Sequence, residues 1–124
     1  MSEQIKKDPL VFIKHIRDSI NEIDSFTKNV SKEKFIEEKL IQNAVIRSIE
    51  VIGEAVKNLP EGFRRKYKEI PWNKIAGMRD KIIHHYFGVD LETIWKVVKE
   101  DIPQLKKQIH KILEKEKWNT TNIM

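Results

Sequence analysis

The sequence predicts an all-α protein, built as an antiparallel bundle of four to five helices. Apolar residues recur at steps of three and four along most of the 124-residue chain, which is the period of an amphipathic helix. No stretch alternates between apolar and polar residues as a half-buried strand would. Proline, glycine and capping residues divide the periodic segments, and helices joined by short connections pack as antiparallel neighbours.

The first predicted helix begins at Asp8 and Pro9. A carboxylate can accept hydrogen bonds from the free N–H groups of a helix start, and proline is favoured in the first turn. The apolar stripe of this helix consists of Leu10, Ile13, Ile16, Ile20 and Ile23. These residues occupy one face, so the helix should bury that face against the rest of the bundle.

The second predicted helix is the longest, with a cap at Ser31, an apolar stripe over residues 35–59 and a stop at residues 60–62. Gly53 interrupts the stripe. Because glycine lowers helix propensity, we expect it to permit the close approach of another backbone. The less regular region that follows, up to Gly77, is predicted to hold one short helical turn.

The third long helix is predicted to start at Pro71 and to end at the break Phe87-Gly88-Val89. Asp90 then caps the last helix, whose apolar residues again recur at helical spacing. Pro103 lies inside this helix. It should kink the helix or split it near Asp101, because proline lacks an N–H group and clashes with the preceding turn.

The length indicates one domain over residues 1–124, with a frayed tail at about 118–124. The absence of cysteine excludes disulfides, thiolate catalysis and cysteine-ligated zinc. The start of the chain has no apolar signal-peptide core and no segment reaches membrane-spanning length, so we expect a soluble cytoplasmic protein without membrane contact. A net charge of +5 favours an anionic partner such as nucleic acid, although a solvated basic surface explains it equally well.

The segment RDKIIHHYFG, from Arg79 to Gly88, contains polar residues that could take part in catalysis or binding. His84 and His85 are adjacent and point about 100° apart in a helix, so a metal site is not expected. His15 and His110, on the first and last helices, are interpreted as structural or solvated. The chain has no glycine-rich phosphate loop, which argues against a nucleoside triphosphate site.

Arg79 and His84 are five residues apart, which places them about 140° apart around a regular α-helix. They could converge if the helix widens or unwinds, line two walls of a groove, or act with the same pair of a second subunit. Together with Tyr86 they would suit RNA cleavage: a histidine moves protons, a guanidinium binds the charged phosphate, and a tyrosine holds a phosphate or stacks on a base. The structural alternative is that Arg79 pairs with a carboxylate, His84 stabilises the helix end and Tyr86 is half-buried.

The spacing Arg79-X4-His84-X-Tyr86 resembles the motif of the HepT-like toxins, which belong to the HEPN superfamily of α-helical ribonucleases. The resemblance extends over about residues 8–113. Three further blocks carry it: AVIRSIEVIGEAVKNLP (44–60), PWNKIAGMRDKIIHHYFGVDLETIW (71–95) and DIPQLKKQI (101–109). It implies a bundle of four to five helices that forms a homodimer and brings two motifs into one cleft.

The resemblance also implies an activity: metal-independent cleavage of RNA, with tRNA or mRNA as the target and no cofactor. Arg79 and His84 would be the catalytic pair, and His85 and Asp80 are candidates for an accessory role. Arg47 and Glu54 match the family's second-helix signature, and we interpret them as structural.

The expected partner is a small nucleotidyltransferase antitoxin of the MntA type, which in the type system neutralises the toxin by attaching AMP to the motif tyrosine, here Tyr86. An AMPylated tyrosine beside His84 would repel RNA through its negative charge. The alternative function is a non-catalytic subunit that binds nucleotide or substrate for a nucleotidyltransferase. A plain dimeric scaffold is less compatible with an intact motif.

Overall fold

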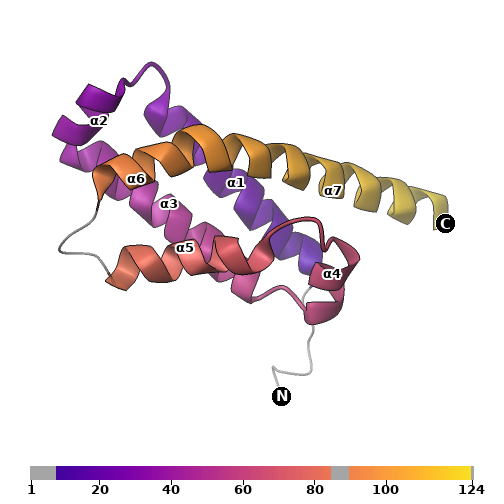
Figure 1. Ribbon diagram of the computed structural model, residues 1–124. Helices are drawn as coiled ribbons and strands as arrows, with labels where there is room; N and C mark the ends of the chain where they lie inside the picture. The colour runs from indigo at the N-terminus through magenta and orange to yellow at the C-terminus, as the bar shows by residue number, and fades with distance from the viewer. Residues whose placement is uncertain (1–7, 85–89, 124) are drawn as a thin grey trace.

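The computed structural model describes residues 8–84 and 90–123; the side chains of residues 81, 83, 84 and 118–123 are outside this description. Within these ranges the chain is helical apart from short connections, and no strand occurs (Figure 1). The elements are α1 (Pro9–Thr27), α2 (Lys32–Glu37), α3 (Lys39–Lys57), α4 (Glu61–Lys66), α5 (Trp72–His84), α6 (Leu91–Lys96), a π-helical segment (Val97–Asp101) and α7 (Ile102–Ile123). The predicted all-α fold is confirmed.

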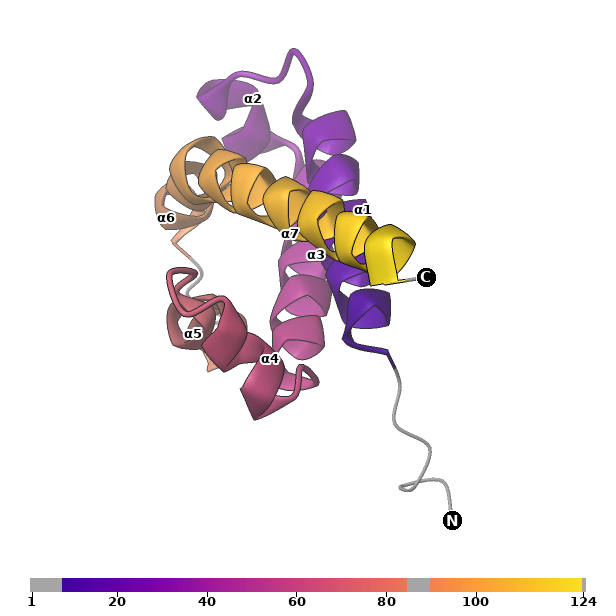
Figure 2. The ribbon, with the colours of Figure 1, turned by 90° about the vertical axis from the view of Figure 1, so that its right-hand side faces the viewer.

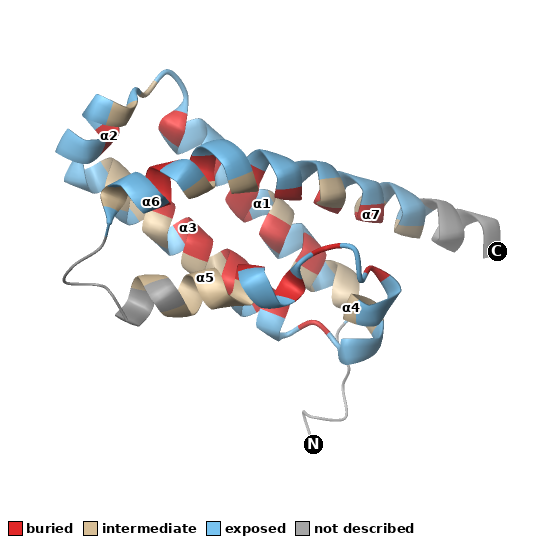
Figure 3. Ribbon diagram, in the orientation of Figure 1, coloured by how far each residue is buried: buried red, intermediate tan, exposed pale blue. Residues whose placement is uncertain are grey.

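Helix α3 is the centre of the fold. It packs against α1 on one side and α5 on the other, while α7 lies across α1 (Figures 1 and 2). Many buried residues follow the inward faces of α1, α3 and α7 (Figure 3). Of the 22 hydrophobic residues buried in the described part of the chain, 12 are isoleucines. This core fixes α3, and α3 in turn carries α5 with the motif.

The predicted helix starts are confirmed by their hydrogen bonds. The Asp8 carboxylate accepts from the N–H of Leu10, and the Ser31 hydroxyl accepts from the N–H of Lys34. Asp90 accepts from the backbone of both residues that follow Leu91 and from the Thr93 hydroxyl. The hydrogen bonds from Thr93 hold the pKa of the Asp90 carboxyl below its ordinary value.

The prediction of one long helix from Ser31 to Pro60 was wrong, because the chain breaks at Glu38 and forms α2 and α3. The apolar stripe has a gap there: charged residues occupy positions 37–39, so nothing on the buried face holds the two helices in line. The Gln42 amide donates to the carbonyls of Phe35 and Ile36, at 2.9 and 2.8 Å. These bonds satisfy the free carbonyls at the end of α2 and stabilise the break.

The last helix divides near Pro103, as the sequence predicted. A π-helical segment ends at Asp101, immediately before the α-helical turn that contains the proline, so the chain changes helix type without leaving the helix. Helix α7 continues to Ile123, and the frayed tail at about 118–124 stays a prediction. The segment after Pro103 contains neither proline nor glycine, so no residue interrupts the helical hydrogen bonds. In the part of the chain that the structure describes, no helix is both long and apolar enough to cross a bilayer.

Candidate active site

Helix α5 is held at its first turn and packs closely against α3 at Arg79. The Trp72 indole is buried and donates to the carbonyls of Arg64 and Tyr67, at 3.2 and 3.0 Å. At the other end, a Cβ added to Gly53 would lie 2.5 Å from the Cβ of Arg79. The close approach predicted at Gly53 therefore occurs, and the atoms that approach belong to the first residue of the motif.

Arg79 is mostly buried, with 28% of its side chain exposed, and lies between two carboxylates. Its Nε atom is 3.4 Å from Oε2 of Glu54, and its Nη1 atom is 3.5 Å from Oδ1 of Asp80. Asp80 is held more tightly by Lys57, at 2.9 Å. The structural alternative predicted such a carboxylate pair. Both contacts of the guanidinium are long, however, so it keeps donor capacity for a phosphate.

A cavity of about 390 Å³ opens beside Arg79 between α1 and α3. His15 from α1, Arg47 and Glu54 from α3, and Arg79 from α5 all line it. His15 lies edge-on to the Phe12 ring, with 6.3 Å between ring centroids. Three elements thus bring two arginines, a histidine and two glutamates to one hollow. The arginines could donate hydrogen bonds to a phosphate there.

His15 and Arg47 were interpreted from the sequence as structural or solvated, and their place in this cavity was missed. Both are remote from the motif along the chain. The match of Arg47 to the family's second-helix signature was a signal for a role at the site, whereas no pattern distinguishes His15 from other polar residues of its helix. Only the packing of α1 and α5 on opposite sides of α3 brings these positions together.

His84 is the last residue of α5, and the backbone is α-helical at every position from Arg79 to His84. The widened or unwound backbone that could place both residues on one face is therefore absent from this segment. His85 and Tyr86 lie outside the described residues. Among the residues that are described, no three histidine or carboxylate side chains are grouped as metal ligands would be.

The other tyrosine, Tyr67, has a structural role remote from the motif. Its hydroxyl donates to the Glu116 carboxylate, which also accepts from Lys66 at 2.8 Å. Burial, followed by this hydrogen bond, raises the pKa of Tyr67. Burial raises the pKa of Glu116, but the hydrogen bonds from Lys66 and Tyr67 outweigh it and lower this pKa below its ordinary value. The interactions of Lys66 and Tyr67 with Glu116 therefore connect α4 to α7.

The all-α bundle, with an arginine of the Arg-X4-His-X-Tyr motif beside a hollow that Arg47 also lines, points to the class of helical ribonucleases. A sequence model of the family described as ribonuclease HepT-like matches residues 16–112. This is most of the chain, so the protein belongs to the HepT-like ribonuclease family, as the resemblance predicted.

Curated relatives agree with this assignment. A "putative RNase" of Caldanaerobacter subterraneus subsp. tengcongensis is 46% identical over 90% of this chain and 99% of its own length. A "probable ribonuclease HepT" of Thermococcus cleftensis is 47% identical over 87% of this chain and 98% of its own. A "gamma-glutamylcyclotransferase and putative RNase" of Methanocaldococcus jannaschii is 50% identical over 95% of this chain, which spans 53% of that relative. No solved structure matches.

Proposed function

We propose that this protein is an endoribonuclease that cleaves RNA without a metal ion and acts as the toxin of a toxin–antitoxin system. One observation carries the proposal: Arg79, the first residue of the motif, is packed against Gly53, and its partly exposed guanidinium lines a cavity together with Arg47. A guanidinium held in place and partly exposed can stabilise the charge of a phosphate transition state. The ribonuclease descriptions of the family and of the relatives support the same chemistry.

The reaction uses the RNA's own 2′-hydroxyl as nucleophile. His84 takes the proton from this hydroxyl as the oxygen attacks the adjacent phosphorus, and Arg79 donates hydrogen bonds to the oxygens that gain charge. The bond to the 5′-oxygen breaks and this oxygen takes up a proton. The products are a 2′,3′-cyclic phosphate and a 5′-hydroxyl, and the step needs neither a metal nor a cofactor.

The active groove is shared between two subunits of a homodimer. Because α5 is regular from Arg79 to His84, the two residues sit about 140° apart around its axis. A two-fold axis that brings two α5 helices together would place Arg79 of one subunit near His84 of the other. This arrangement resolves the geometry without a change in the backbone.

Control of the nuclease acts through Tyr86. A nucleotidyltransferase of the MntA type attaches AMP to the phenol, which places a charged group two residues from His84. The negative charge repels the RNA backbone and the nucleotide fills the groove. The toxin is thereby silenced with its fold intact.

The test is RNA cleavage by the purified protein in excess EDTA, beside Arg79→Ala and His84→Ala. We expect each substitution to lower the cleavage rate by at least about 100-fold, as for the loss of one transition-state donor. His110→Ala, an exposed histidine on α7, is the matched control and should retain full activity. Intact mass of every sample is measured as well, because an AMPylated Tyr86 would imitate an inactive enzyme.

Two results would contradict the proposal. If unmodified protein leaves tRNA and mRNA intact, the protein is instead a non-catalytic subunit that binds nucleotide or substrate for a nucleotidyltransferase. If EDTA abolishes cleavage and a divalent ion restores it, the metal-independent mechanism fails. Growth arrest on expression of the protein alone, relieved by His84→Ala, distinguishes a toxin from such an accessory subunit in cells.

A further inference from the structure

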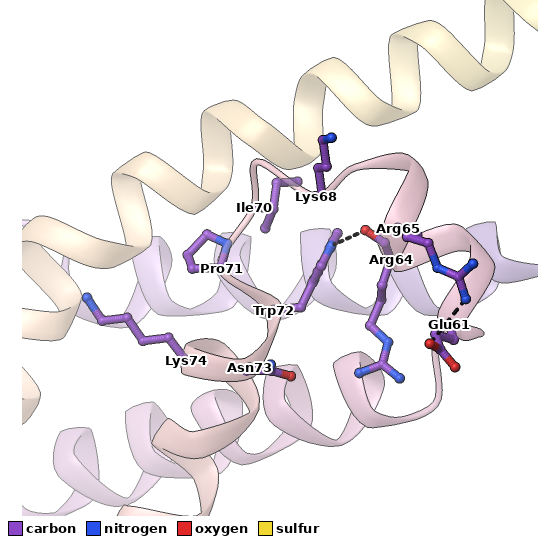
Figure 4. Close-up of a pocket in the computed structure, with 9 residues that line it drawn as sticks. All are labelled: Glu61, Arg64, Arg65, Lys68, Ile70, Pro71, Trp72, Asn73 and Lys74. Atoms are coloured by element: carbon purple, nitrogen blue, oxygen red, sulfur yellow. Dashed lines mark hydrogen bonds and ion pairs between the residues drawn. The ribbon is translucent and has the colours of Figure 1, made fainter.

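A second and larger cavity, of about 570 Å³, lies where α4 turns into α5 (Figure 4). Four of the side chains that line it are cationic, Arg64, Arg65, Lys68 and Lys74, and one is acidic, Glu61. The cavity belongs to neither the motif nor the hollow beside Arg79. The excess of positive charge in its lining favours an anionic ligand.

Most of this positive charge is uncompensated. Arg65 pairs with Glu61 at 3.1 Å, whereas Arg64, Lys68 and Lys74 form no ion pair with any residue that the structure describes. The Nε atom of Arg64 is buried and has no hydrogen-bond partner among those residues. A buried guanidinium nitrogen without an acceptor is unfavourable. An anion bound by the terminal nitrogens of the same guanidinium would stabilise its charge.

Neighbouring residues fix the position of Arg64 beside the cavity. The carbonyl of Arg64 accepts from the buried Trp72 indole, so the backbone that carries the guanidinium is fixed to the start of α5. The first-turn residues Trp72, Asn73 and Lys74 line the same cavity, which places the positive end of the 13-residue helix there. In Figure 4 the Arg64 guanidinium and the Asn73 amide both lie below the Trp72 ring, to its right and left.

The cations are spread too widely for one small ion. Figure 4 shows Lys68 and Lys74 projecting in different directions from the turn, away from the Arg64 guanidinium. A single phosphate could contact Arg64 but not all three groups. A chain of phosphates could pass from one rim of the cavity to the other, and RNA is the polyanion that the proposed function supplies.

We propose that this cavity binds successive backbone phosphates of the RNA substrate, a few nucleotides from the bond that is cut. The inference rests on the proposed function, because the same helix carries both sites. Asn73 and Arg79 are six residues apart, which is about 9 Å along α5. About three stacked nucleotides, at roughly 3.4 Å each, span that length.

Binding of single-stranded RNA carrying 2′-O-methyl groups tests the inference, because this RNA lacks the nucleophile and stays intact. Its affinity for the full chain is measured at several salt concentrations by fluorescence anisotropy. The cavity variant is Arg64→Ala with Lys74→Ala. The control is Lys107→Ala with Lys111→Ala, which removes the same charge from an exposed face of α7. Losing two phosphate contacts should reduce the slope of log K against log salt by about 1.4, and the control should leave it unchanged.

The readout separates this inference from the proposed function. If RNA is cleaved but both double variants lose the same slope, the cavity is not a phosphate site, although the nuclease assignment stands. If the cavity variant alone loses the slope while no RNA is cut, the cavity binds RNA and the nuclease assignment fails. If orthophosphate displaces the RNA at a concentration comparable to that of the RNA phosphates, the cavity is a small-anion site and the inference is overturned. Lys68→Ala with Lys74→Ala, both exposed, serves if the Arg64 variant does not fold.

Discussion

At the scale of single residues, Gly53 decides where Arg79 lies. A Cβ at position 53 would meet the Cβ of Arg79 at 2.5 Å, closer than side-chain atoms pack. A Cβ at Gly77, on α5 itself, would meet no described atom within 4 Å. Both glycines lie in helices, but only Gly53 contacts Arg79. Comparing alanine substitutions at the two positions therefore separates the effect of helix propensity from the effect of this contact.

We therefore predict opposite outcomes for two alanine substitutions. Gly77→Ala should stabilise the protein by up to about 1 kcal/mol, the helix propensity of alanine over glycine, and leave cleavage unchanged. Gly53→Ala should lower stability despite the same propensity gain, and should reduce RNA cleavage because α5 and Arg79 must shift. Urea denaturation and a cleavage assay on both variants check this. Equal stabilisation by the two substitutions would show that the contact at Arg79 is not tight.

At the scale of elements, the hydrogen bond from Tyr67 to Glu116 connects the α4 region to α7. Burial and this hydrogen bond raise the pKa of Tyr67 in the folded protein, whereas the unfolded chain ionises near its ordinary value of 10.0. Above pH 10 the unfolded state therefore loses the tyrosine proton first. The folded state binds more protons there, so the free energy of unfolding falls as pH rises.

Replacing Tyr67 by phenylalanine should remove the contribution of Tyr67 to the fall in the free energy of unfolding at alkaline pH. At neutral pH, Tyr67→Phe should lower the free energy of unfolding by about 1.5 kcal/mol, the value of a hydrogen bond to a charged group, with Lys66 still paired to Glu116. Between pH 7 and values above 10 the variant should lose less stability than the unaltered protein. Urea titrations across this pH range measure both effects, and parallel pH curves would contradict the assignment.

At the scale of the whole molecule, the proposed groove between two subunits makes a prediction that a single-chain site does not. In a mixed dimer of Arg79→Ala and His84→Ala subunits, one of the two grooves would contain both catalytic residues and the other neither. Because half of the dimers are mixed after random exchange, the mixture should recover about a quarter of the activity of the unaltered protein.

The measurement is cleavage after the two inactive variants are unfolded and refolded together, compared with the two refolded separately. Co-refolding Arg79→Ala with a sample of itself controls for the procedure. If the mixture stays as inactive as its components, each groove takes both residues from one chain, and α5 must then change its backbone between Arg79 and His84 when RNA binds.

The sequence alone determined the helical class, the helix starts at Asp8, Ser31 and Asp90, and the motif with its family. Helical period, capping chemistry and motif spacing are local properties, so they can be read from neighbouring residues. The break between α2 and α3 depends on a hydrogen bond from Gln42 to the turn before it. The sequence did not predict this break, because apolar residues recur at helical spacing both before and after it.

Only the tertiary structure decided which residues share a site. Arg79 contacts Gly53 and Glu54 and shares a cavity with His15 because α1 and α5 both pack on α3, and no local pattern encodes such an arrangement of distant segments. The cationic cavity at the start of α5 likewise depends on the turn from α4 and on the Trp72 indole that fixes it. Local sequence specifies elements, whereas a site forms only where packing brings remote elements together.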